Sequence, residues 1–126
     1  MGILDFFSKK EKQLKVFYHN YDTNEGIDAN KPQKASLELA LDLFETLNQN
    51  VNNFFGIIDD NGKTIQFIAL EDDDGDDWCI DIPDIEKNGF WQKVAGYDEC
   101  TIFIEEFYNG KIDMTDFEFE PDKCMT

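Results

Sequence analysis

The sequence predicts an α+β fold, in which an antiparallel sheet of four to five strands has one amphipathic helix before it and one after it. Two stretches carry apolar residues at helical spacing, 37–47 and 98–110. Between them, Asn61-Gly62 separates two runs rich in β-forming residues, and this dipeptide is the strongest short hairpin signal. Together these observations place a sheet between two helices.

The chain has 126 residues, which suits one domain. Its first fifteen residues, MGILDFFSKKEKQLK, contain four of the 11 lysines together with Ile3, Leu4, Phe6 and Phe7. We interpret residues 1–15 as an amphipathic, basic N-terminal segment and residues 16–126 as a single α+β domain. For this segment we favour packing on the domain or fraying over membrane contact through residues 1–12. A myristoylation signal would need Ser or Thr at the position of Phe6.

The elements of the first half follow from local signals. A short strand is expected at Val16–Tyr18, and the turn formers of residues 22–33 indicate a loop. Ser36 is the expected N-cap of a helix whose buried side is formed by Leu37, Ala40, Leu41, Phe44 and Leu47. A two-residue turn at Asn61-Gly62 pairs Ile58 with Ile65, Gly56 with Phe67 and Phe54 with Ala69, and we take these residues as the core face.

The second half is expected to continue the sheet and then return to helix. Trp78, Ile80 and Ile82 alternate with polar residues in a third strand that ends at Pro83, and a fourth strand follows Gly89 over 90–94. Over 98–110 we favour a helix over a hairpin at Asn109-Gly110, with Asp98 as N-cap, Gly110 at the left-handed end and one apolar side formed by Cys100, Phe103, Ile104, Phe107 and Tyr108. Residues 114–120 are expected to add an edge strand.

The charge of the chain restricts its partners. The net charge is −17, and the 11 basic residues are all lysines. Residues 71–122 hold 18 acids and 3 lysines, so −15 of the net charge lies there. This balance argues against binding to nucleic acid or anionic membrane, and it favours fast, salt-sensitive association with a basic protein.

The stretch LEDDDGDDW concentrates this charge before the third strand. An EF-hand loop with Gly75 at its sixth position would put Leu70 first and Asp81 twelfth, so the match fails, and a weak Ca²⁺ or Mg²⁺ site is the lesser alternative. A solvated turn is the simplest interpretation. As a functional hypothesis, the partner-binding residues are Glu71, Asp72, Asp73, Asp74, Asp76, Asp77 and Trp78. For Trp78 itself we favour the core, because Ile80 and Ile82 share its face.

No constellation in the sequence indicates catalysis. His19 is the single histidine, no Gly-rich phosphate loop is present, and carboxylates are too numerous for any pair to be informative. We therefore expect no enzyme and no cofactor. Cys79, Cys100 and Cys124 are odd in number and lack a CxxC, so we expect neither a disulfide framework nor zinc. With no visible signal peptide or membrane span, we expect the cytoplasm.

The order of elements over residues 36–120 resembles a family of small bacterial immunity proteins. The resemblance rests on DECTIFIEEFYNGKIDMTDFEFEP, with its helix-ending Phe107-Tyr108-Asn109-Gly110 and the final pair Phe119-Glu120, and on DNGKTIQFIAL and DGDDWCIDI. It implies a cytoplasmic antidote that binds and inhibits a basic domain of a contact-delivered polymorphic toxin, often a nuclease or deaminase. An acidic interaction or regulatory module without a toxin link is the alternative.

Overall fold

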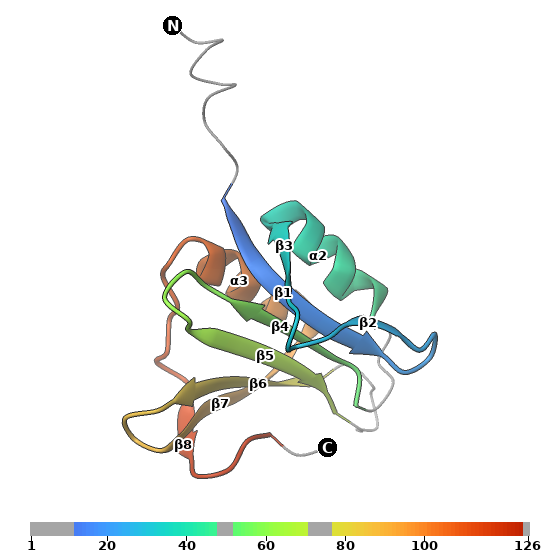
Figure 1. Cartoon of the computed structure of the whole chain (residues 1–126). Coiled ribbons are helices and arrows are strands. Elements are labelled where there is room, and N and C mark those ends of the chain that lie inside the picture. Colours follow the sequence, from blue (N-terminus) through green and yellow to red (C-terminus); the bar gives the residue numbers. More distant parts are fainter. Residues whose placement is uncertain (1–11, 48–51, 71–76, 125–126) are drawn as a thin grey trace, which may run out of the picture.

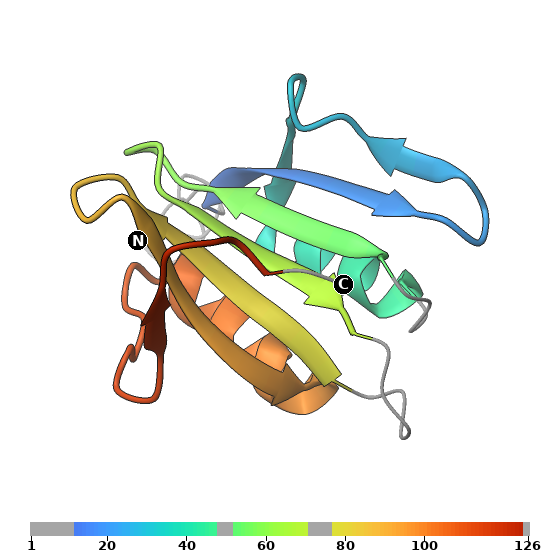
Figure 2. The same cartoon turned by 90° about the horizontal axis from the view of Figure 1, so that it is seen from below.

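The computed structural model describes residues 12–47, 52–70 and 77–124, which form one antiparallel sheet covered on one face by two helices (Figure 1). The strands are β1 (Gln13–Asn20), β2 (Glu25–Ile27), β3 (Gln33–Ser36), β4 (Phe54–Ile58), β5 (Thr64–Ala69), β6 (Asp77–Asp84), β7 (Gly89–Gly96) and β8 (Glu118–Glu120). The helices are α2 (Leu37–Thr46) and α3 (Tyr97–Tyr108). Figure 2 shows both helices on one side of the sheet and the C-terminal segment crossing the other side, which we call the open face.

The α+β class is confirmed, but the sheet is larger than predicted. It has eight strands in the order β2-β1-β4-β5-β6-β7-β8, with β3 paired to another part of β1. Three strands precede α2 and one strand follows α3, so the helices lie within the strand order rather than around it. The segment predicted as a loop, 22–33, contains β2 and the start of β3. These strands were not predicted because their mainly polar residues show no apolar–polar alternation. Since β1 begins at Gln13, the last three residues of the predicted N-terminal segment also belong to the sheet.

The hairpin between β4 and β5 is confirmed, but the predicted register is wrong by one residue. Ile58 pairs with Thr64, and Ile57 pairs with Ile65. The turn is longer than two residues because the Asp59 N–H donates to the Lys63 carbonyl at 2.9 Å and Gly62 adopts a left-handed φ of 82°. This slip turns the opposite side of β4 to the core, so that Phe55 and Ile57 are buried there.

Both helices are confirmed, and the five residues predicted for the buried side of α3 are all buried. Of the set predicted for α2, Ala40, Phe44 and Leu47 are buried, whereas Leu37 and Leu41 are half-buried. Ser36 caps α2 by accepting from the Leu39 N–H at 3.2 Å. The N-cap of α3 is Gly96 instead of Asp98, and the left-handed Gly110 follows its end. Phe44 of α2 is fully buried and is the centre of an aromatic cluster, with ring centroids 4.7 to 5.7 Å from those of Phe55, Phe67, Trp78 and Tyr97.

Strand β6 is buried on both faces and runs past its predicted end. Trp78, Ile80 and Ile82 face the helices, whereas Cys79 and Asp81 lie buried on the open face under the C-terminal segment. Pro83 pairs with Phe90 inside the strand. The β5–β6 ladder ends at Asp81, so one side of β6 has no strand neighbour in the described sheet at Pro83, and the missing N–H is tolerated there.

Candidate interaction surface on strands β6 to β8

Most of the predicted partner-binding stretch, residues 71–76, lies outside the described residues. Asp77 begins β6 and is half-buried. Trp78 is fully buried, with its ring centroid 4.7 Å from that of Phe44. Its side chain is therefore not available as an anchor for a partner, and the prediction that it belongs to the core is confirmed.

Acidic side chains do come together farther along the same strands, at a shallow hollow of about 400 Å³. The register places Cys79 opposite Val94 on the open face, and Gln92 opposite Glu118 of β8. We call this the acidic hollow, and it is lined by Cys79, Gln92, Lys93, Val94, Asp116, Glu118 and Glu120. Its one lysine lies 3.5 Å from the Glu99 carboxylate, so the hollow is left with an excess of negative charge.

The acidic hollow also lies beside a stretch of strand edge. β8 pairs only with residues 90–92 of β7, although β7 runs on to Gly96. Residues 93–96 thus have no strand neighbour on that side within the described sheet. Val94 on this stretch is 55 % exposed, so an apolar side chain stands next to the three carboxylates.

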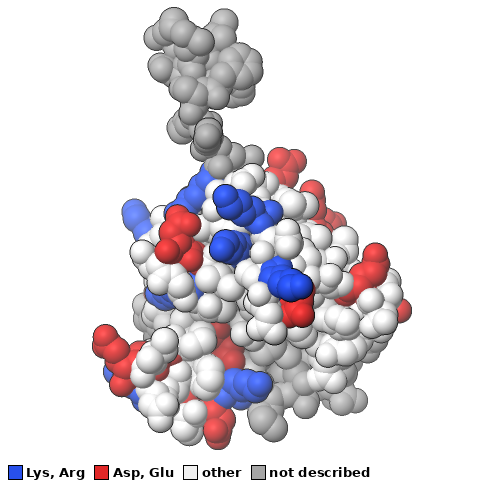
Figure 3. All heavy atoms as spheres, viewed as in Figure 1, with Lys and Arg blue, Asp and Glu red and all other residues white. Residues whose placement is uncertain are grey.

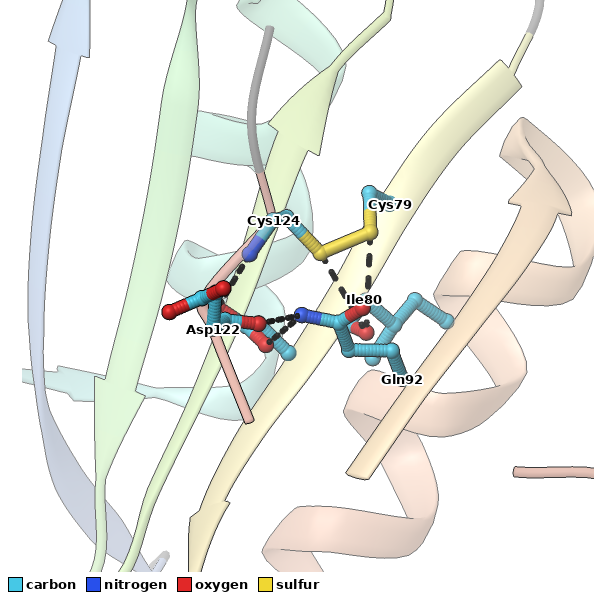
Figure 4. Close-up of a disulfide and its surroundings, with 6 residues drawn as sticks. Cys79, Ile80, Gln92, Asp122 and Cys124 are labelled. Atoms are coloured by element: carbon cyan, nitrogen blue, oxygen red, sulfur yellow. Dashed lines mark hydrogen bonds between the residues drawn. A yellow bond between two sulfur atoms is a disulfide. The ribbon is translucent and has the colours of Figure 1, made fainter. Parts of the chain in front are cut away.

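A disulfide joins Cys79 of β6 to Cys124, with their Cα atoms 6.2 Å apart (Figure 4). No disulfide framework was expected from the sequence, and this single disulfide was not predicted. The pairing spans 45 residues and leaves Cys100 over, so neither count nor spacing revealed it. One signal was available, because the alternation that buries Trp78 against the helices puts Cys79 on the opposite face.

Buried Asp81 holds the same segment through its carboxylate. Its oxygens accept from the Cys124 N–H at 3.1 Å and from the Gln92 amide at 3.0 Å. The same amide donates to the Asp122 carbonyl at 2.7 Å (Figure 4). Burial raises the pKa of Asp81, since water is excluded from its charged form, and the two hydrogen bonds offset only part of this effect. Sequence reasoning missed this role because Asp81 was one acid among 28.

A second hollow of about 500 Å³ lies on the open face beyond this segment. We call it the aromatic hollow, and it includes Phe17, Tyr21, Phe54, Ile68, Lys123 and Cys124. Cys79 lines the acidic hollow and Cys124 lines the aromatic one. The disulfide-held segment therefore separates the two hollows.

The side chains that could take part in catalysis or metal binding are a histidine, a free thiol and the carboxylates. His19 is half-buried, with its ring 4.2 Å from that of Tyr21 and 6.4 Å from that of Phe54. The Cys100 thiol is fully buried, and burial raises its pKa, so it is a poor nucleophile. Within residues 12–47, 52–70 and 77–124, no cluster of three or more His, Cys, Asp or Glu side chains could hold a metal ion.

The charges are unevenly distributed in space as well as in sequence. Figure 3 shows lysine side chains together with acidic ones on the upper part of that view. Lys15 of β1 pairs with Lys34 of β3 in the sheet. The acidic hollow lies at the other edge of the sheet, on β7 and β8. The carboxylates of the acidic hollow can attract a cationic surface to this edge of the molecule.

In the described part of the chain, neither helix is long and apolar enough to cross a membrane. Comparisons with protein-family models, with curated proteins and with solved structures found no match for this chain.

Proposed function

We propose that this protein is a cytoplasmic immunity protein, which binds and inhibits a basic toxin domain through the acidic surface of β6 to β8. The observation that carries the proposal is the charge asymmetry, with −15 of the net −17 in residues 71–122. The acidic hollow and the edge of β7 lie in this part of the chain. Residues 71–76, which precede β6 in the sequence, contain five of the acids that give residues 71–122 this charge.

The physics of association supports a division of roles on this surface. Long-range attraction from clustered carboxylates raises the rate of encounter with a basic domain and weakens with salt. Affinity then depends on apolar contacts that exclude water. Val94, at 55 % exposure, is the apolar side chain that β7 offers beside the acids, whereas Phe119 packs on Trp91 on the opposite face of the sheet.

The toxin link itself rests on the resemblance over residues 36–120. The helix ending at Tyr108, the left-handed Gly110 and the short strand around Phe119 follow one another in the order that the resemblance requires. An acidic regulatory module would have the same surface and would differ in its partner. The identity of the partner therefore decides between these two functions.

The test is co-expression with the product of the gene directly upstream, with binding measured by surface plasmon resonance at several salt concentrations. In the test variant, Asp116→Asn, Glu118→Gln and Glu120→Gln remove three charges from the acidic hollow. A matched control removes three exposed charges elsewhere, with Glu25→Gln, Asp42→Asn and Glu45→Gln. Stable co-purification and an on-rate lowered about three- to tenfold at low salt in the test variant alone would support the proposal. Equal effects of the two variants, or no complex, would contradict it.

A further inference from the structure

We propose that residues 121–124 form a redox-gated strap, which the Cys79–Cys124 disulfide holds across β6 and which reduction by a dithiol releases. Release uncovers Asp81 and joins the acidic and aromatic hollows into one docking face for the basic partner. The choice of partner rests on the proposed function, whereas the gating of the strap does not.

The strap is attached at few points. Of its four residues, only Cys124 is buried, at 9 % exposure, whereas Pro121, Asp122 and Lys123 are exposed. Its main-chain contacts are the Cys124 N–H on the Asp81 carboxylate and the Asp122 carbonyl on the Gln92 amide. Apart from the backbone of the chain, the disulfide is the one covalent bond that attaches the strap to the sheet. Without it, the strap is held by the two main-chain hydrogen bonds and by the contact of Cys124 Sγ with the Ile80 carbonyl at 3.8 Å. These contacts oppose the conformational freedom that the strap regains on release.

The surface that the strap covers suits a cationic partner once the strap is released. Asp81 is 2 % exposed in the closed form and is the one buried carboxylate in the described part of the chain. When water returns to it, its charged form is favoured, and this charge joins those of Glu118 and Glu120 on the same face. Because the strap is the wall between the two hollows, its departure also connects the carboxylates to Phe17 and Phe54.

The chemistry of release is thiol–disulfide exchange. A thiolate of the dithiol attacks one sulfur, the S–S bond breaks through a mixed disulfide, and the second thiol of the reductant displaces the protein. The dithiol is oxidised to its own disulfide, while Cys79 and Cys124 gain two electrons and two protons and become thiols. The cytoplasm keeps protein thiols reduced, so the strap would be released where the proposed function operates.

Hydrogen exchange on the full-length chain tests the gate without any partner. We compare the oxidised protein, the same protein in dithiothreitol, and Cys124→Ser. Exchange of the residue-124 N–H, which donates to the Asp81 carboxylate in the oxidised protein, should be at least about tenfold faster in the latter two, which corresponds to 1.4 kcal/mol. Exchange at Phe55 and Ile57 in the core should stay slow, which shows that the fold persists. Equal protection of the strap in oxidised and reduced protein would overturn the proposal.

Thiol labelling supplies a second measurement, which does not depend on a variant that folds. In the reduced wild-type protein, iodoacetamide should modify Cys79 and Cys124 at least about tenfold faster than Cys100, which stays buried on the inner side of α3. Labelling of all three at the slow rate of Cys100 would contradict release of the strap. A released strap without a basic partner would refute the proposed function alone, and a bound partner with a closed strap would refute only the gate.

Discussion

Removing the Cys79–Cys124 disulfide by Cys124→Ser should lower the free energy of unfolding of the oxidised protein by about 2–4 kcal/mol. The two cysteines are 45 residues apart in sequence. The chain-entropy relation for a loop of that size gives about 4 kcal/mol at 25 °C, which is an upper figure because structure in the unfolded chain reduces it. The substitution also removes the packing of the one buried residue of the strap, and this loss is small beside the loop term.

Urea unfolding followed by circular dichroism measures this difference. The wild-type protein in dithiothreitol is the matched control, since it has the same loop opened without a mutation. Its free energy of unfolding should agree with that of Cys124→Ser, and both should lie below that of the oxidised wild type. Thiol counting in denaturant should find one thiol, that of Cys100, before reduction and three after it.

The reasoning fails if the oxidised wild type and Cys124→Ser unfold at the same urea concentration while thiol counting shows the disulfide intact. Such a result would mean that closing this loop places no useful constraint on the unfolded chain. A reduced wild type that is much less stable than Cys124→Ser would show that the serine forms new contacts in the strap.

Three further predictions concern the core and the buried carboxylate. Phe44→Ala should cost about 3–5 kcal/mol by urea unfolding, whereas Leu39→Ala on the exposed side of the same helix should cost less than about 1 kcal/mol, and similar costs would refute the aromatic cluster as the centre of the core. At Gly56, a Cβ would overlap the Phe17 ring, so Gly56→Ala should cost about 1–3 kcal/mol and should be partly rescued by Phe17→Leu, and additive effects would argue against this contact. Since burial raises the pKa of Asp81 above its ordinary 3.8, the folded protein holds this proton more tightly than the unfolded chain, and the resulting stability is full below 3.8 and is lost as pH rises through the folded pKa. Carboxyl NMR should therefore place the Asp81 midpoint above 3.8 in the oxidised protein and closer to 3.8 in Cys124→Ser, and an unchanged midpoint would contradict its burial by the strap.

The parts of the fold with strong local periodicity could be predicted from the sequence. The apolar side of α3 recurs at i, i+3, i+4, i+7 and i+8, and the structure buries those five residues. The cap at Ser36 and the alternation of Trp78, Ile80 and Ile82 are similar local signals. In each case, neighbouring residues in the chain contain the information.

The errors come from features that depend on distant partners. β2 and β3 are short and polar, and they form only because β1 offers its edge. The register of the β4–β5 hairpin depended on the turn, where the Asp59 side chain accepts from Asn61 and Lys63 N–H groups and stabilises a longer turn than Asn-Gly alone suggests. A one-residue slip then exchanged the two faces of β4.

Only the negative charge of the candidate site could be predicted from the sequence. The acidic half of the chain was evident by counting, but the acidic hollow needs Asp116 and Glu118 to meet Val94 across two strands. The disulfide and the pairing of Asp81 with Cys124 join residues more than 40 positions apart, and no local pattern encodes such contacts.

The salt dependence of the on-rate for the upstream gene product shows most directly whether the acidic edge holds a basic partner. We expect a complex with the wild type whose on-rate falls steeply with salt. The salt dependence should be weaker when Asp116, Glu118 and Glu120 are neutralised, and unchanged when Glu25, Asp42 and Glu45 are neutralised instead. An on-rate that does not respond to salt, or that responds equally in both variants, would contradict binding through the acidic edge.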